Sequence, residues 1–273
     1  MPVPNGDAIG PALTPGLAER IEIALRATGE SRARHLLAVP GNPLGIESRT
    51  FGDVEATVVR EPVWYYGYFG GLRGVRRGLE RELAEALAWL RAERQPARVA
   101  LSPLETDARL MARLFELGLR PASFMSVLYG PGRIDDVPLP PGVVVWEARD
   151  AYLASRLLGA PPEQQAALEP VQRAEFRDWR GYVAEVDGQL AARAALLIGD
   201  GFGSLAAGDT DERLRGRGAQ SALLRRRIAD TLAAGCDLVV STAAAGSISQ
   251  RNMERAGFRL AYTQTVWSDP PTA

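Results

Sequence analysis

The sequence contains no lysine, so all 32 of its basic residues are arginine. A Walker A loop needs a lysine to reach the phosphates of a nucleotide, and Schiff-base catalysis needs a lysine amine. Both kinds of chemistry are therefore excluded. We attribute the arginine bias itself to a GC-rich genome and draw no function from it.

Cysteine and histidine occur once each, as Cys236 and His35. One cysteine cannot build an intrachain disulfide framework, and this pair offers too few ligands for a structural zinc site, so we expect no metal. Cys236 opens a strand of the buried type with no histidine near it in the sequence, which favours an inert thiol over a nucleophile. For His35 we expect a surface or capping role.

Long apolar runs and a strong excess of charge are also missing. No segment approaches the length that spans a bilayer, and the first residues lack the basic and apolar regions of a secretory signal. A net charge of −1 and a pI near 6.0 argue against nucleic-acid binding by bulk electrostatics, although the run Arg225–Arg227 keeps that alternative open. We expect a cytoplasmic protein with no membrane or nucleic-acid partner.

Strands and helices alternate along the chain, which indicates an α/β protein. A proline-rich stretch at 134–142 is typical of a linker. The order of long helix, strand, short helix and strand before this stretch is repeated after it, so the two halves resemble a diverged repeat. We therefore predict two domains, residues 1–135 and 141–273.

Local signals mark several elements within these halves. Thr14 and Pro15 are typical of a helix start, and we expect that helix to end at Gly29. The pair Asp187–Gly188 favours a tight hairpin turn between two strands.

The stretch RLRGRGAQSALLRRRI, Arg213 to Ile228, puts two glycines directly before a helix. The first N–H groups of a helix have no partner within it and lie at the positive end of its dipole. Because Gly216 and Gly218 lack β-carbons, an anion can approach the main chain closely, and the neighbouring arginines add charge. The stretch predicts a cradle for a pyrophosphate. We expect a side chain at Gly218 to block the anion and leave the fold largely intact.

Two other interpretations of this stretch remain open. A surface turn with solvated arginines has the same composition. A Rossmann dinucleotide site needs a third glycine, where this chain has Ser221, and a strand that runs directly into the first glycine, where DERLR intervenes. Asp237 lies near the spacing of the acidic residue in that fold, but at the start of its strand rather than the end.

The segment RLRGRGA, residues 213–219, resembles the signature R/Q-x-x-G-x-G/A of the GNAT superfamily of acyl-CoA-dependent N-acyltransferases. Its surroundings are similar to the family too: a strand ending at Thr210, the signature, a long helix, the strand CDLVVST, a short helix and RAGFRLAY. The resemblance covers residues 143–267, and the first half resembles a degenerate domain of the same kind. It implies an α/β (α+β) fold of two GNAT-like domains, each a mixed, splayed β-sheet flanked by helices, as in bacterial tandem proteins.

The same resemblance implies acetyl-CoA or another acyl-CoA as co-substrate. Pantetheine would lie between the strands GSLAAGDT and CDLVVST, and the pyrophosphate would rest on the N–H groups of the following helix. The implied cofactor-binding residues are Asp209, Thr210, Arg213, Arg215, Gly216, Arg217, Gly218, Ala219, Gln220, Ser221 and Asn252. The matching loop of the first half, LRGVRRG, has Arg76 and Arg77 at the Gly–Ala positions, so we expect one cofactor site per chain.

The family reaction, as the resemblance implies it, is direct attack of an amine on the thioester, with a base for the amine and often a tyrosine as acid for the thiolate. The tyrosine position falls on Met253, which cannot donate a proton. Asp209 is a candidate base, and Tyr262, on the closing strand, is a candidate acid. An acyl-CoA-binding protein without activity is the alternative.

The acceptor is expected to be a small-molecule or peptide amine, and the protein a monomer or homodimer. An aromatic cluster fits a substrate groove in the first half, although strand alternation directs half of it to the core. Its members are Trp64, Tyr65, Tyr66 and Tyr68.

Overall fold

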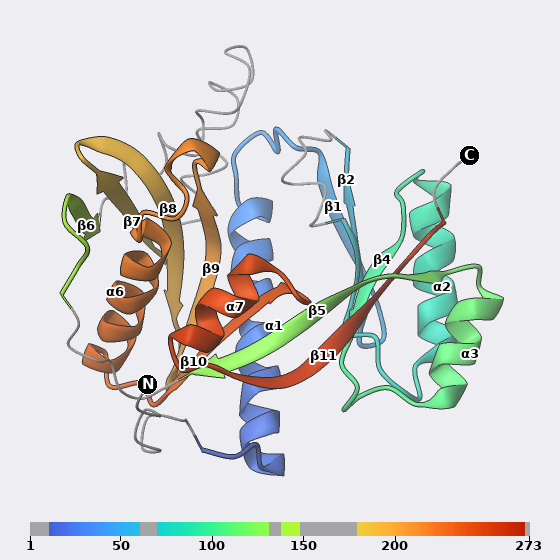
Figure 1. Cartoon of the computed structure of the whole chain (residues 1–273). Helices are drawn as coiled ribbons and strands as arrows, with labels where there is room; N and C mark the ends of the chain where they lie inside the picture. The colour runs from blue at the N-terminus through green and yellow to red at the C-terminus, as the bar shows by residue number, and fades with distance from the viewer. Residues whose placement is uncertain (1–10, 61–69, 131–137, 148–178, 271–273) are drawn as a thin grey trace. The chain divides into compact units, whose positions relative to one another are not determined.

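The structure is a computed structural model that describes residues 11–60, 70–130, 138–147 and 179–270. The chain forms two compact units (Figure 1). The first combines the residues up to Leu36 with Val127–Ala261, and the second combines Leu37–Ser126 with the residues from Tyr262 on. Both units contain helices and strands, which confirms the α/β class.

The first unit begins with a long helix and continues with a sheet and two further helices. Its elements are α1 (Pro15–Leu37), β6 (Val143–Glu147), β7 (Trp179–Val186), β8 (Gln189–Ile198), β9 (Phe202–Thr210), a 3-10 turn (Glu212–Leu214), α6 (Ala219–Ala233), β10 (Leu238–Ala244) and α7 (Ile248–Arg255). The pairs β6–β7, β7–β8 and β8–β9 are antiparallel, whereas β10 runs parallel to β9. The sheet is therefore mixed, as predicted.

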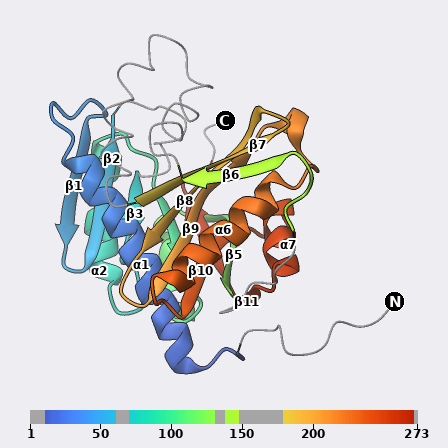
Figure 2. The same ribbon diagram turned by 90° about the vertical axis from the view of Figure 1, so that its left-hand side faces the viewer.

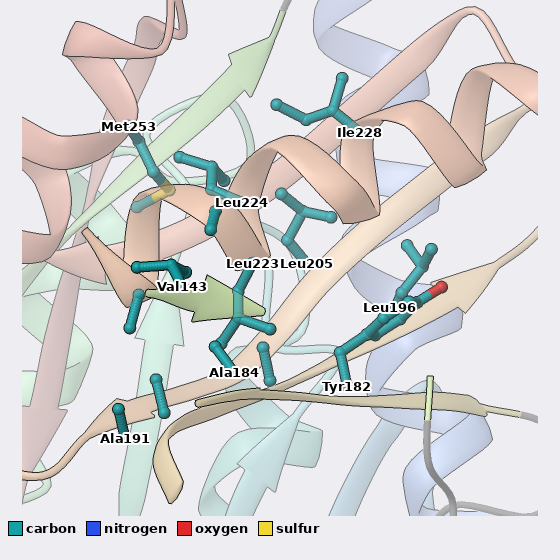
Figure 3. Packing of buried hydrophobic residues seen from close by; sticks show 14 of the residues in the cluster. Val143, Tyr182, Ala184, Ala191, Leu196, Leu205, Leu223, Leu224, Ile228 and Met253 are labelled. Carbon is teal, nitrogen blue, oxygen red and sulfur yellow. The ribbon is translucent and has the colours of Figure 1, made fainter. Parts of the chain in front are cut away.

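The two faces of this sheet carry different clusters because side chains alternate along a strand. Tyr182, Leu196 and Leu205 face α6 and pack against its apolar side, which includes Leu223 and Ile228 (Figure 3). Figure 2 shows α6 lying along β7, β8 and β9. A separate cluster on these strands contains Trp179, Val183, Ala195 and Leu197.

The second unit has a small antiparallel sheet covered by a helix. Its elements are β1 (Ile46–Phe51), β2 (Val54–Val59), β3 (Gly71–Arg73), α2 (Glu80–Ala92), β4 (Arg98–Leu101) and α3 (Ala108–Glu116). The buried face of α2, with Leu83, Leu87 and Leu90, packs in a core that includes Val54 and Val58 of β2. Two long strands, β5 (Arg120–Gly130) and β11 (Arg259–Ser268), contribute residues to both units.

Hydrogen bonding defines two sheets. The smaller has the order β1-β2-β3, and the larger has the order β4-β11-β5-β10-β9-β8-β7-β6. Because β10 and β9 are adjacent in the larger sheet, the strand before the signature and the strand after its helix are direct neighbours.

The compact units are interleaved in the sequence and differ from the contiguous domains 1–135 and 141–273 that the sequence led us to expect. Helix α1 is held in the first unit, where the Trp179 indole donates to Ser31 at 3.2 Å. The end of β11 lies in the second unit, where it pairs with β4. Both attachments join residues that are far apart in the chain, so local patterns do not reveal them. The roles expected for the two parts stay predictions.

Candidate functional site

Strands β9 and β10 separate from each other part of the way along. Their parallel pairing runs from Phe202 with Leu238 to Leu205 with Ser241, and both strands continue beyond it. At the last pair the Ser241 hydroxyl donates to the Leu205 carbonyl at 2.9 Å. The splayed sheet predicted from the sequence is therefore present, and we call the point where pairing stops, at Leu205 and Ser241, the fork.

A bulge lies in β9 just beyond the fork. Arg193 of β8 is opposite Asp209, but Ala195, two residues on, is opposite Ala206, so β9 contains one extra residue here. Ala207 takes up the change with a φ of 51°, which is unusual for a residue with a side chain. The bulge redirects the last residues of β9, which lead to the signature.

Two glycines in left-handed conformation shape the signature loop. Gly216 has a φ of 79° and Gly218, the N-cap of α6, a φ of 88°. Gly218 has no side chain to cap the helix, and the first main-chain bond after it runs from Ala222 N–H to its carbonyl. The N–H groups of residues 219–221 thus have no acceptor within the helix, and the first turn of α6 contains no acidic residue. This geometry favours an anion.

A pocket of about 660 Å³ opens at this helix end. Its lining comes from the end of β9, the signature loop with the start of α6, and helix α7. It includes every predicted cofactor residue except Arg213 and Arg217. The sequence prediction missed several lining residues, namely Gly208, Leu214, Ser247, Ile248, Ser249 and Arg255. Gly208 adjoins the predicted residue Asp209 in the sequence, and in the structure a β-carbon there would stand 2.8 Å from the Gln220 amide nitrogen.

The arginines of the signature are bound to acids of the protein itself. Arg213 pairs with Asp211 at 2.7 Å, and this contact lowers the pKa of the Asp211 carboxyl to about 2. Arg217 pairs with Asp187 of the β7–β8 hairpin. Arg213 and Arg217 do not line the pocket, whereas Arg215 does. Main-chain N–H groups, rather than free guanidinium groups, therefore dominate the cradle.

The sequence led us to expect that a side chain at Gly218 would leave the fold largely intact, and the backbone there contradicts this expectation. The φ of 88° is strained for any residue with a β-carbon. In addition, a β-carbon would stand 2.5 Å from Cγ of Pro140, which belongs to the proline-rich stretch. Gly218 is thus required by the fold as well as by any anion.

The two catalytic candidates do not come together at the pocket. Asp209 lines the pocket, is 57% exposed and accepts from Arg193 at 2.7 Å. Tyr262 is buried in β11, belongs to the second unit and does not line the pocket. Met253 of α7 is buried in the core against α6 (Figure 3). The catalytic roles of Asp209 and Tyr262 stay predictions.

The remaining candidates lie elsewhere. Cys236 is a buried free thiol, and burial raises its pKa, which agrees with an inert side chain. His35 is buried at the end of α1, so the expected surface position is wrong. The aromatic cluster at 64–68 lies outside the described residues. In the described ranges we find no set of three or more His, Cys, Asp or Glu side chains suited to a metal, and no helix long and apolar enough to cross a bilayer.

No family model and no curated protein matches the sequence, but solved structures do. A GCN5-related N-acetyltransferase from Kribbella flavida superposes with a TM-score of 0.61 at 20% identity, covering 92% of this chain and 96% of its own. A GCN5-related N-acetyltransferase from Sphaerobacter thermophilus superposes with a TM-score of 0.55 at 16% identity, covering 97% of this chain and 96% of its own. A tandem GNAT protein from the clavulanic acid biosynthesis pathway gives 0.52 at 18% identity, with 73% of each chain covered. The chain therefore has the fold of the GNAT N-acetyltransferases.

Proposed function

We propose that this protein is an acyl-CoA-dependent N-acyltransferase, and specifically that it transfers the acetyl group of acetyl-CoA to an amine. One observation carries the proposal. The fork, the bulge and the uncapped start of α6 follow one another along a single stretch of chain, from β9 through the signature loop. The pocket joins the end of β9 to the first turn of α6, so one elongated ligand can contact both.

The residues of the pocket fit the two chemical parts of such a ligand. The N–H groups of Ala219, Gln220 and Ser221 suit a pyrophosphate, because each adds a hydrogen bond to a charged oxygen. Gly216 leaves room at the loop, since nothing lies within 4 Å of the place of its missing β-carbon. The main chain of β9 beyond the fork lacks its parallel neighbour and suits the amides of pantetheine.

The acyl group of the bound thioester is the electrophile. The reaction requires two proton transfers. The acceptor amine must lose one, for which Asp209 is the proposed base. The departing thiolate must gain one. Tyr262 is the acid proposed from the sequence, although it does not line the pocket. The acceptor is a small-molecule or peptide amine, and we propose no nucleic-acid or membrane partner.

A second function, acyl-CoA binding without catalysis, is favoured by one observation. Met253 stands where the family resemblance implies a tyrosine acid, and its side chain is buried in the core, only 5% exposed. A protein with this residue keeps a binding pocket but lacks the usual proton donor.

Calorimetry with CoA and a thiol-release assay with acetyl-CoA and a panel of amines separate these functions. We expect one CoA site per chain and thiol release that depends on an amine. Binding without release for any amine supports the second function. No binding of CoA contradicts both.

A further inference from the structure

Arginine 227 is a buried cation in the middle of α6. It is only 3% exposed, although arginine rarely lies fully inside a protein. Its neighbour Arg226 behaves in the ordinary way, with a side chain 40% exposed and an ion pair to Asp230 at 3.0 Å. Burying a guanidinium is costly unless its donors are satisfied, so the contacts of Arg227 are informative.

These contacts are three main-chain carbonyls, two of them beside the bulge. Nε of Arg227 donates to the Leu223 carbonyl, one turn earlier in α6, at 3.1 Å. Nη1 donates to the Ala195 carbonyl of β8 at 3.2 Å and to the Ala206 carbonyl of β9 at 3.4 Å. Ala195 and Ala206 are opposite each other in the sheet and form the last regular pair before the bulge. The guanidinium therefore fastens the helix to both strands at the point where β9 changes direction.

Two successive carbonyls of β9 are thus held by side chains from neighbouring elements. Ser241 of β10 binds the Leu205 carbonyl, and Arg227 of α6 binds the Ala206 carbonyl. The next residue, Ala207, adopts the strained φ of 51°, and the three residues after it line the pocket. Strained backbone persists only where its surroundings fix it, and these two side chains supply that fixation.

Helix α6 also carries the anion cradle at its start. Arg227 comes eight positions after Ala219, which is about 12 Å along a helix axis. A ligand that contacts both the cradle and the end of β9 requires a constant offset between them. We propose that Arg227 is a positioning residue that sets this offset, by locking the bulge of β9 to the helix that bears the cradle; the inference rests on the proposed acyl-CoA function.

The substitution Arg227→Met tests this role, because Met fills similar space without the donors. We expect the affinity for CoA to fall about tenfold or more, which corresponds to the loss of charged hydrogen bonds. ADP contains the adenosine and pyrophosphate but no pantetheine, so its affinity should change by less than about twofold. The matched control is Arg226→Met, on the adjacent position, which should alter neither affinity.

The comparison of the two ligands separates positioning from general stability. Equal weakening of CoA and ADP by Arg227→Met, or no weakening of either, would overturn the inference. If that variant does not fold, as judged by its circular dichroism, Ser241→Ala replaces it in the test. This substitution removes the hydrogen bond to the Leu205 carbonyl, and it should lower the affinity for CoA but not for ADP. A result for Ser241→Ala that affects both ligands equally would overturn the inference too. Failure of the unmodified protein to bind CoA would instead overturn the proposed function, and this inference with it.

Discussion

The start of α6 and the start of α2 form a natural comparison within the molecule. Each follows an arginine–glycine loop with a glycine at nearly the same φ, 88° for Gly218 and 87° for Gly78. Gly218 is the N-cap of α6, whereas Gly78 directly precedes the N-cap of α2, Leu79. The first turns differ: α6 has no acidic residue there, whereas α2 has Glu80 and Glu82. A similar loop pattern therefore precedes two helix starts that differ in charge.

The carboxylates at the start of α2 accept hydrogen bonds from nearby main-chain N–H groups. Glu80 accepts from the main-chain N–H of Gly78 at 3.3 Å, and a hydrogen bond from its own main-chain N–H lowers the pKa of Glu82. The sequence suggested that the bulk of Arg76 and Arg77 closes this loop. The structure shows these arginines bound elsewhere, Arg76 to Asp53 at 2.5 Å and Arg77 to the Leu104 carbonyl at 3.3 Å. The two loops therefore differ in the charge of the first helical turn, and the effect of Arg76 and Arg77 on a phosphate stays a prediction.

The largest expected effect comes from giving α6 the acid that α2 has. Ser221 is exposed in the first turn of α6, so Ser221→Glu should leave the helix as stable or more stable. The new carboxylate would compete with a pyrophosphate for the same N–H groups and repel it. We expect the affinity for CoA to fall at least about 100-fold, measured by calorimetry.

The control for this variant is Ser221→Gln, which adds the same bulk without charge. Its affinity for CoA should stay within about threefold of the unmodified protein. Equal losses for Glu and Gln would assign the effect to bulk. No loss for Glu would remove the anion cradle from the proposed site.

The next effect concerns the two glycines with matching φ. Gly78→Ala should cost about 1–2 kcal/mol in the free energy of unfolding, because a β-carbon is strained at this φ and nothing lies within 4 Å of it. Gly218→Ala meets the same strain and also Pro140, so it should cost at least about 1 kcal/mol more. Denaturant unfolding of both variants measures the difference. Equal costs would mean that Pro140 moves aside freely.

Predictions from the sequence succeeded where a short pattern determines the local structure. Asp187 and Gly188 adopt φ values of 50° and 75° in the hairpin turn between β7 and β8, as their types favour. Glycines before an apolar-periodic stretch located the start of α6. The pocket is formed by the chain on either side of that start, so most residues predicted to bind the cofactor line it, and their binding role stays a prediction.

Predictions failed where distant contacts decide the outcome. Helix α1 continues past Gly29 to Leu37, because the turns beyond the glycine are held by contacts such as that of Ser31 with Trp179. The partner of Arg217 is 30 residues away in the sequence, and the neighbour of Gly218 is Pro140. A motif gives the residue types of a loop but not the groups that pack on it.

A smaller effect is expected for the ion pair between Arg217 and Asp187. Both side chains are partly exposed, and exposed pairs contribute at most about 1 kcal/mol. Arg217→Ala should therefore lower the free energy of unfolding by about 1 kcal/mol or less. Since Arg217 does not line the pocket, CoA affinity should change by less than about threefold. A loss as large as that of Ser221→Glu would show that this arginine contacts the ligand.

The smallest effect is a dependence of the folding stability on pH that comes from Asp211, at the entrance to the signature loop. Asp211 accepts from the Arg213 main-chain N–H at 2.9 Å and from its guanidinium, and its pKa is lowered from 3.8 to about 2. A depressed carboxyl stabilises the fold above its unfolded pKa, and this contribution disappears as the pH falls through the folded value. The stability difference between the unmodified protein and Asp211→Asn should therefore be constant above about pH 5 and shrink towards pH 2. Urea midpoints across this range measure it, and Arg213→Ala, which removes the charged partner, should flatten the same dependence. A difference that is equally large at pH 5 and pH 2 would show that the Asp211 contact does not depend on its charge.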